Sequence, residues 1–158
     1  MDAIALESIK ELTTTLRAAR LSGVSGRQAR NGDVGSVDGL RGLARAYLGY
    51  AEEHPAVYEA MFVRRTDLVF GSAETPEVLR TAFSEILAGV APFATGDAET
   101  LTEVFWSALH GQATLNHGGR LRPAHRRARA DLLVAVLTSD RLLGNKPSPD
   151  AGFVPESG

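Results

Sequence analysis

The sequence contains no cysteine, which excludes disulfide bonds, cysteine-ligated zinc and thiol chemistry. It also lacks any apolar run close to the roughly 20 residues that a membrane-spanning helix needs. The first residues, MDAIALESIK, have neither the basic start nor the apolar stretch of a signal peptide. We therefore expect a cytoplasmic protein that does not bind the membrane.

A surplus of basic charge is missing as well. The chain has 17 Lys and Arg residues against 19 Asp and Glu residues, a formal net charge of −2. Proteins that bind nucleic acids usually carry a basic surplus, because contacts to phosphate supply most of the affinity. We therefore expect no direct nucleic-acid contact. One local cluster is basic and consists of Arg120, Arg122, Arg126, Arg127 and Arg129. No aromatic residue lies between its members, so we interpret it as solvated surface or the rim of a dimer interface.

Motifs for catalysis and for metal binding are absent too. The sequence has no serine-centred nucleophile turn, no phosphate-binding loop and no zinc-binding helix motif. His110 and His117 are separated by two helical turns, about 10 Å along the axis, which is too far for both to ligate one zinc ion. The acidic pair Glu52–Glu53 lies at an expected helix end, where exposure to solvent is ordinary. We predict no enzymatic activity, no metal and no cofactor.

Helical periodicity is what the sequence does contain. Apolar residues recur at steps of three and four, the spacing that places them on one face of a helix. No segment alternates apolar and polar residues as an amphipathic strand does, so we expect an all-α fold of about six helices. These cover about 2–20, 37–53, 55–62, 75–91, 97–117 and 123–138. We expect one domain over residues 1–143 and a disordered tail over 144–158, with a mobile connection at 21–36 and a loop or lid at 63–74.

The expected fifth and sixth helices have more apolar surface than one core can cover. In the fifth, Leu101, Val104 and Phe105 belong to one stripe, and Leu109 belongs to a second stripe beside it. The sixth has a continuous apolar run over 132–137. Either both helices lie deep in a monomeric core, or they meet a second subunit, and we favour the second reading. Joining two such helix pairs makes a dimeric four-helix bundle.

Two segments resemble a known family. The run VFWSALHGQATLNHGGRL, with Trp106, His110 and Gly111 in order, is similar to the tryptophan–histidine–glycine signature of the C-terminal domain in one branch of TetR-type transcriptional repressors. The segment GLRGLARAYLGYAEEHPAVYEAMF, which contains Tyr47 and Tyr58, also matches that branch. The resemblance extends from about residue 40 to residue 137, and the first helix fits the helix that precedes this domain in the family.

The resemblance implies a function that the spacing alone does not give. Such repressors have an N-terminal DNA-binding domain and a helical C-terminal domain that holds a pocket for a small-molecule effector. Their last two long helices usually form the homodimer interface, and effector binding releases the operator. This chain departs from the family because it shows no helix-turn-helix and no basic recognition helix. We therefore expect sensing and dimerisation, with DNA binding absent from this chain.

Candidate site residues follow from these patterns. For a mostly apolar effector pocket we predict Tyr47, Tyr50, Tyr58, Met61, Phe62, Phe83, Phe105, Trp106 and His110. For the homodimer interface we predict Leu109, Gly111, Gln112, Leu115, Leu132, Leu133, Val136 and Leu137. The simpler alternative is that the aromatic residues are ordinary core. The simpler alternative for His110 is a buried histidine whose ring nitrogen is hydrogen-bonded to a carbonyl or hydroxyl of the protein.

Two other functions are weighed against the sensor. A helical interaction module that binds no small molecule would have a filled core, and such a module could pair with a full-length relative that carries the DNA-binding domain. A small enzyme would need titratable groups that converge in a pocket, which the sequence does not indicate.

Overall fold

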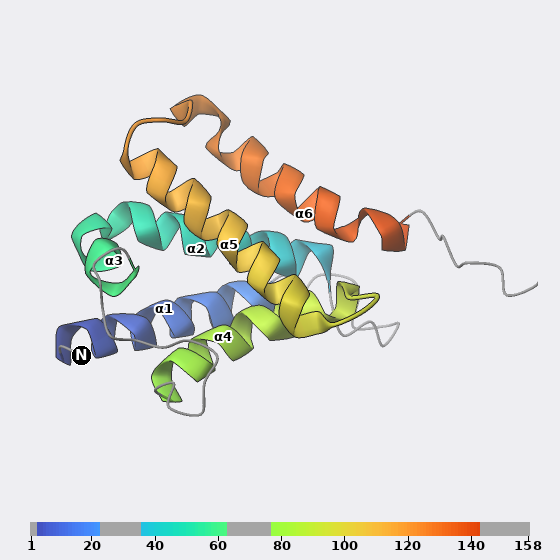
Figure 1. Ribbon diagram of the computed structural model, residues 1–158, viewed down its shortest axis with the longest axis horizontal. Coiled ribbons are helices and arrows are strands. Elements are labelled where there is room, and N and C mark those ends of the chain that lie inside the picture. The colour runs from blue at the N-terminus through green and yellow to red at the C-terminus, as the bar shows by residue number, and fades with distance from the viewer. Residues whose placement is uncertain (1–2, 23–35, 63–76, 143–158) are drawn as a thin grey trace, which may run out of the picture.

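The computed structural model describes residues 3–22, 36–62 and 77–142, and within them it contains six α-helices and no strand (Figure 1). The helices are α1 (Ala3–Ser22), α2 (Val37–Glu53), α3 (Pro55–Phe62), α4 (Glu77–Val90), α5 (Ala98–His117) and α6 (Arg126–Leu142). This confirms the all-α fold. The predicted loop or lid at 63–74 and the predicted tail lie outside the described residues, as does most of the connection at 21–36.

Side-chain caps fix where two of the helices begin. The Ser36 hydroxyl accepts a hydrogen bond from the Gly39 N–H at 2.8 Å and starts α2. The Asp97 carboxylate accepts one from the Thr100 N–H at 2.9 Å and starts α5. Gly119, with φ at +66°, follows the end of α5 and adopts a conformation that suits glycine. These ends agree with the boundaries predicted from the sequence.

The sixth helix differs from its prediction at both ends. Pro123–His125 form a 3₁₀ turn, and the α-helix begins only at Arg126. At its other end the helix continues past Thr138 to Leu142. The hydroxyl of Thr138 donates to the carbonyl of Val134 at 2.9 Å, so this polar residue satisfies its side chain without ending the helix.

Helix α2 occupies the centre of the fold, because it packs against each of the other five helices (Figure 1). Leu40, Leu43, Ala44 and Tyr47 on α2 are almost completely buried. Helix α5 crosses α2 and α4 but leaves part of its surface uncovered. Helix α2 therefore lies at the centre, and α5 has exposed apolar side chains rather than lying deep in a monomeric core.

Helices α1 and α2 touch through their backbones at one end of α1. A methyl group built on Gly39 would lie 2.9 Å from the carbonyl oxygen of Arg20, and one on Gly42 would lie 2.9 Å from that of Ala19. No side chain fits at that distance, so the two glycines allow the close approach. The C-terminal end of α1 is thereby held directly against the first turns of α2.

A buried carboxylate ties α1 to α4 near the same end. Glu85 on α4 is 6% exposed, and it accepts hydrogen bonds from Arg17 Nε at 2.7 Å and from an Arg20 guanidinium nitrogen at 2.9 Å. Burial on its own would raise the pKa of Glu85, but the hydrogen bonds from Arg20 and Arg17 outweigh it and lower that pKa. Glu85 is therefore an ionised, paired group that fixes the spacing between the two helices.

Candidate functional site

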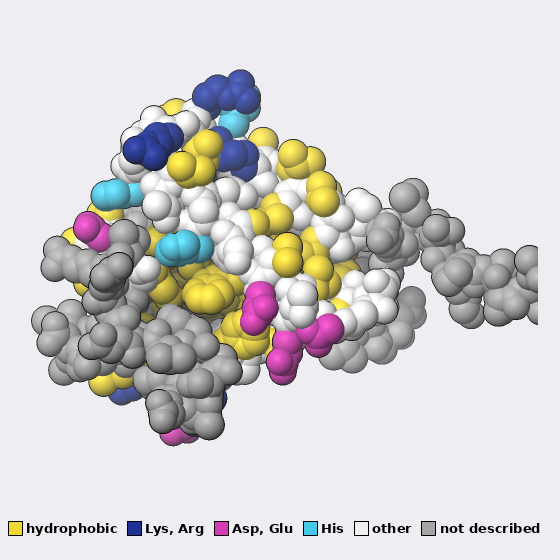
Figure 2. All heavy atoms as spheres, in the orientation of Figure 1, with side chains coloured by type: hydrophobic (Ala, Val, Ile, Leu, Met, Phe, Trp, Pro, Cys, Tyr) yellow, Lys and Arg dark blue, Asp and Glu magenta, His cyan; other side chains and the backbone are white. Residues whose placement is uncertain are grey.

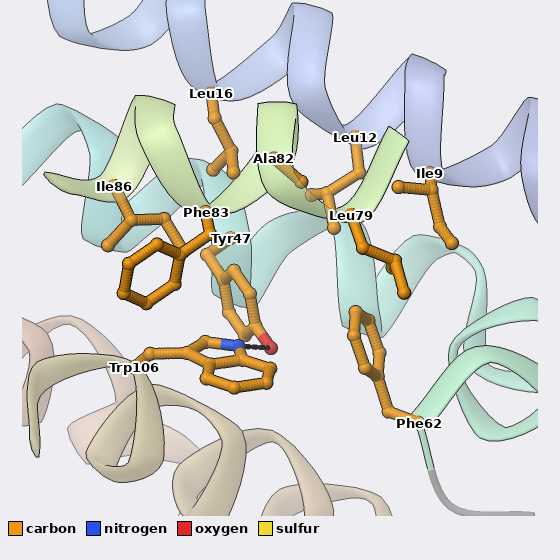
Figure 3. Close-up of a pocket in the computed structure, with 10 residues that line it drawn as sticks. All are labelled: Ile9, Leu12, Leu16, Tyr47, Phe62, Leu79, Ala82, Phe83, Ile86 and Trp106. Carbon is orange, nitrogen blue, oxygen red and sulfur yellow. Dashed lines mark hydrogen bonds between the residues drawn. The ribbon is translucent and has the colours of Figure 1, made fainter. Parts of the chain in front are cut away.

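A small apolar cavity lies between α1, α2, α4, α3 and α5 (Figure 3). Its volume is about 30 Å³, roughly that of one water molecule. Ten side chains line it: Ile9, Leu12, Leu16, Tyr47, Phe62, Leu79, Ala82, Phe83, Ile86 and Trp106. Among the described residues that line it, the polar atoms are the Tyr47 hydroxyl and the Trp106 indole N–H, which point toward each other in Figure 3.

A chain of hydrogen bonds runs from this cavity to the side of α5. The Trp106 indole N–H donates to the Tyr47 hydroxyl at 3.0 Å. The Tyr47 and Tyr58 hydroxyl oxygens are 3.0 Å apart, and the Tyr58 hydroxyl lies 2.6 Å from His110 Nδ1. The chain therefore joins α2, α3 and α5 through four side chains.

Burial shifts the ionisation of every titratable member of this chain. It raises the pKa of Tyr47 to about 12 and also raises the pKa of Tyr58. It lowers the pKa of His110, because the charged imidazolium loses hydration in the partly buried site. At neutral pH all three groups are uncharged, and the chain is a set of neutral hydrogen bonds.

The structure places the predicted pocket residues in three different surroundings. Four of them line the cavity: Tyr47, Phe62, Phe83 and Trp106. Tyr58 and His110 stand behind this wall in the hydrogen-bond chain, and the ring of Phe62 contacts both of theirs. The side chain of Met61 lies outside the described residues.

Two predicted pocket residues lie away from the cavity lining. Phe105 is completely buried in the core. The Tyr50 hydroxyl donates to the Ser8 carbonyl on α1 at 3.1 Å, and Tyr50 is not among the lining residues. Burial, and then the nearby Glu11 carboxylate, raise the pKa of Tyr50.

Six lining residues were not singled out from the sequence: Ile9, Leu12, Leu16, Leu79, Ala82 and Ile86. They belong to the apolar faces of α1 and α4. The helical spacing of these residues was visible in the sequence, but nothing in it shows which apolar stripes face one another across a gap. The sequence therefore indicated the aromatic residues of this lining but not the aliphatic ones.

The predicted interface residues divide by exposure. Leu115, Leu132 and Val136 are exposed, and Val136 is 67% exposed although it is a β-branched apolar residue. Gly111, Gln112, Leu133 and Leu137 are half-buried, whereas Leu109 is completely buried in the subunit. Val104, which was not among the predicted interface residues, is 59% exposed. Figure 2 shows hydrophobic side chains over the surface that α5 and α6 form.

Gly111 and Gln112 give this surface two further features. A methyl group built on Gly111 would meet nothing within 4 Å, so the subunit itself offers no reason for a glycine there. The buried Gln112 Oε1 has no hydrogen-bond partner among the described residues. Gly111 therefore leaves room beside α5, whereas the Gln112 oxygen is an unsatisfied acceptor inside the subunit.

Basic side chains gather at the turn between α5 and α6 (Figure 2). There is no Asp or Glu between Glu103 and Asp131 in the sequence. Arg126 pairs with Glu52, while Arg129 donates to the Asn116 side-chain oxygen at 2.7 Å. Acidic residues lie instead where α5 begins, at Asp97, Glu99 and Glu103. This gives the two ends of α5 opposite side-chain charge.

A wider and more polar hollow lies beside this turn. Its volume is about 210 Å³, and its lining includes Glu52, Asn116, His117 and Arg126. None of the predicted pocket residues lines it.

In the described part of the chain, no three residues of the kinds that ligate metals gather closely enough to hold an ion. No helix within that part is long and apolar enough to span a membrane.

The described residues thus form an all-helical domain with a small apolar cavity and with large apolar side chains exposed on α5 and α6. The comparison with protein families gives the class. The family model of the tetracyclin repressor-like C-terminal domain matches residues 40–137, and the chain belongs to this family. The family is regulatory rather than enzymatic. A search of curated proteins found no match.

Family membership confirms the resemblance seen in the sequence and sets its range. The matched residues contain most of α2, all of α3, α4 and α5, and most of α6, so the hydrogen-bond chain lies wholly within them. Helix α1 lies before the matched range but supplies three of the residues that line the cavity. The site in this chain is therefore shared between the family domain and the helix that precedes it.

Proposed function

We propose that this chain is the effector-binding and dimerisation domain of a cytoplasmic transcriptional repressor of the TetR type, and that it senses a small, largely apolar molecule. One domain over residues 1–143 carries both roles. DNA would be contacted only through a separate N-terminal domain. The observation that carries the proposal is the apolar cavity bounded by Tyr47 and Trp106, within a domain of a regulatory family.

The chemistry of the cavity wall favours an uncharged ligand. No charged side chain is among the ten that line it. Placing a carboxylate or ammonium group there would cost far more than a ligand of this size gains from apolar contact. The effector is therefore bound mainly by burial of apolar surface, at about 25 cal/mol per Å² of area removed from water.

The ligand must make part of its own space. A cavity of about 30 Å³ is well below the roughly 300 Å³ or more of ordinary small-molecule sites. Three aromatic lining side chains are only partly buried, namely Phe62, Phe83 and Trp106, while Leu12, Leu16 and Tyr47 are at most 2% exposed. We infer that the ligand enters by displacing the partly buried aromatic residues.

Dimerisation is supported by the exposed face of α5 and α6. Val104, Leu115, Leu132 and Val136 are large apolar residues that the subunit leaves exposed. A second copy packed on this face would cover them, and the open position at Gly111 would let the helices approach closely. The alternative of a deep monomeric core does not account for this exposure.

Native mass spectrometry of the purified chain tests both parts of the proposal. We expect a dimer, and we expect it to retain an apolar small molecule from the expression host under gentle conditions. A dimer that binds no compound from a panel of uncharged aromatic and alicyclic molecules would contradict sensing. A monomer at high concentration would contradict dimerisation.

One observation favours a second candidate, a helical homodimer that binds no ligand and acts by pairing with a full-length relative. Such a module would have a nearly filled core, and the cavity of about 30 Å³ fits that description. The compound panel separates the two candidates. Ligand-dependent stabilisation of the dimer supports the sensor, and its absence supports the interaction module.

A further inference from the structure

Counting protons gives the hydrogen-bond chain a direction. The Trp106 indole N–H can only donate, so the Tyr47 oxygen is the acceptor in the first bond. Either hydroxyl of the Tyr47–Tyr58 pair can donate, and the role of His110 Nδ1 depends on its tautomer. In one arrangement every hydroxyl proton has an acceptor: Tyr47 donates to Tyr58, and Tyr58 donates to His110 Nδ1. Because a buried hydroxyl proton without an acceptor is costly, we assign this direction, with the His110 proton on Nε2.

This direction determines what the cavity wall offers to a ligand. Both Tyr47 and Trp106 line the cavity, and the remaining lining residues have apolar side chains (Figure 3). Trp106 is half-buried, whereas Tyr47 is 1% exposed, so the indole is the member of this pair that can be displaced. When it moves, the Tyr47 oxygen loses a donor but its own proton stays on Tyr58. The wall then presents a hydrogen-bond acceptor.

We propose that the effector is a neutral, mostly hydrocarbon molecule with one hydrogen-bond donor, an alcohol or a phenol, whose O–H replaces the Trp106 indole N–H on the Tyr47 oxygen. This inference rests on the proposed sensor function and names the class of its ligand. A ketone or an ether of the same size gains nothing from Tyr47, because in the direction assigned above the Tyr47 proton is donated to Tyr58. An amine or a carboxylate is excluded by the lack of a charged partner in the wall.

Binding can be measured through the fluorescence of Trp106, the residue that the ligand displaces. Trp106 is the only tryptophan in the chain, so its emission follows its own displacement from Tyr47. The full chain is titrated with cyclohexanol, which has a donor, and with cyclohexanone, which has only an acceptor. Because the ketone carbonyl absorbs near the excitation wavelength of tryptophan and can quench its emission, the ring ether oxane, which is transparent there and also has only an acceptor, is titrated in parallel and decides the comparison. All three are six-membered rings of similar size. We expect cyclohexanol to bind with a dissociation constant about tenfold lower, the contribution of one hydrogen bond.

Two variants make the test specific. Tyr47→Phe removes the acceptor and keeps the ring, so we expect the preference for the alcohol to disappear while circular dichroism reports a folded protein. Phe83→Ala enlarges the cavity without touching the hydrogen-bond chain, so we expect all three compounds to bind more tightly and the preference to remain.

The outcomes distinguish this inference from the proposed function. Equal binding of the alcohol and the ether to the wild-type chain and to Phe83→Ala would overturn the donor requirement and leave the sensor standing. Failure of all three compounds to bind, even to Phe83→Ala, would overturn the cavity as a ligand site and the donor requirement with it.

Discussion

His110 shows how one residue can combine packing with polarity. Its imidazole lies against the rings of Tyr58, Phe62 and Trp106, and its Nδ1 lies 2.6 Å from the Tyr58 hydroxyl. The sequence left two roles open for His110: contact with an effector, or a buried histidine satisfied by a protein carbonyl or hydroxyl. The geometry provides the neighbouring hydroxyl, and a role toward an effector stays a prediction.

The pH dependence of stability follows from this environment. Burial lowers the pKa of His110 in the folded protein, so as the pH falls below about 6.5 the unfolded chain takes up the proton first. We expect the free energy of unfolding to decrease between pH 7 and pH 5.5 and to gain nothing from this group above pH 7. Urea denaturation at several pH values measures it. His110→Asn, which cannot titrate, should show a smaller decrease, and an unchanged one would contradict the assignment.

At the scale of helices, the contact between α1 and α2 depends on two glycines. We expect Gly42→Ala to destabilise the protein by about 1–3 kcal/mol, because the new methyl group would press on the Ala19 carbonyl oxygen and the backbones would have to separate. Chemical denaturation gives the free energy of unfolding.

Gly49→Ala is a matched control on the same helix. A methyl group there meets nothing within 4 Å, so we expect it to stabilise the protein by roughly 0.5–1 kcal/mol through helix propensity alone. If the two substitutions had similar effects, the close approach of α1 and α2 would not matter for stability.

The helices themselves could be predicted from the sequence because each signal is local. The caps at Ser36 and Asp97 and the glycine at 119 lie next to the elements they bound. The mutual placement of helices depends on distant residues instead. The pairing of Glu85 with Arg17 and Arg20 joins residues more than sixty positions apart, and no pattern in the sequence indicates it. The aliphatic half of the cavity was missed for the same reason.

At the scale of the whole molecule, the face of α5 and α6 determines the expected assembly. We predict that Val136→Glu weakens the dimer by about a hundredfold in dissociation constant, because a carboxylate buried in an apolar interface has no partner. Sedimentation over a range of concentrations measures the change. Leu21→Glu alters an exposed leucine at the end of α1 and serves as the control. A Val136→Glu protein that dimerises as tightly as wild type would place the interface elsewhere.

The separation of charge along α5 has an electrical consequence for the whole domain. Exposed carboxylates lie where α5 begins, and exposed arginines lie at the turn where it ends, although the net charge of the chain is only −2. These side chains oppose the dipole of the helix backbone, which is positive at its start and negative at its end. Because whole charges on these side chains exceed the roughly half charge at each helix end, α5 and its following turn remain polarised although the net charge of the chain is small. In an external field, such as that above a charged polymer, the domain would turn the α5–α6 corner toward negative charge before any contact forms.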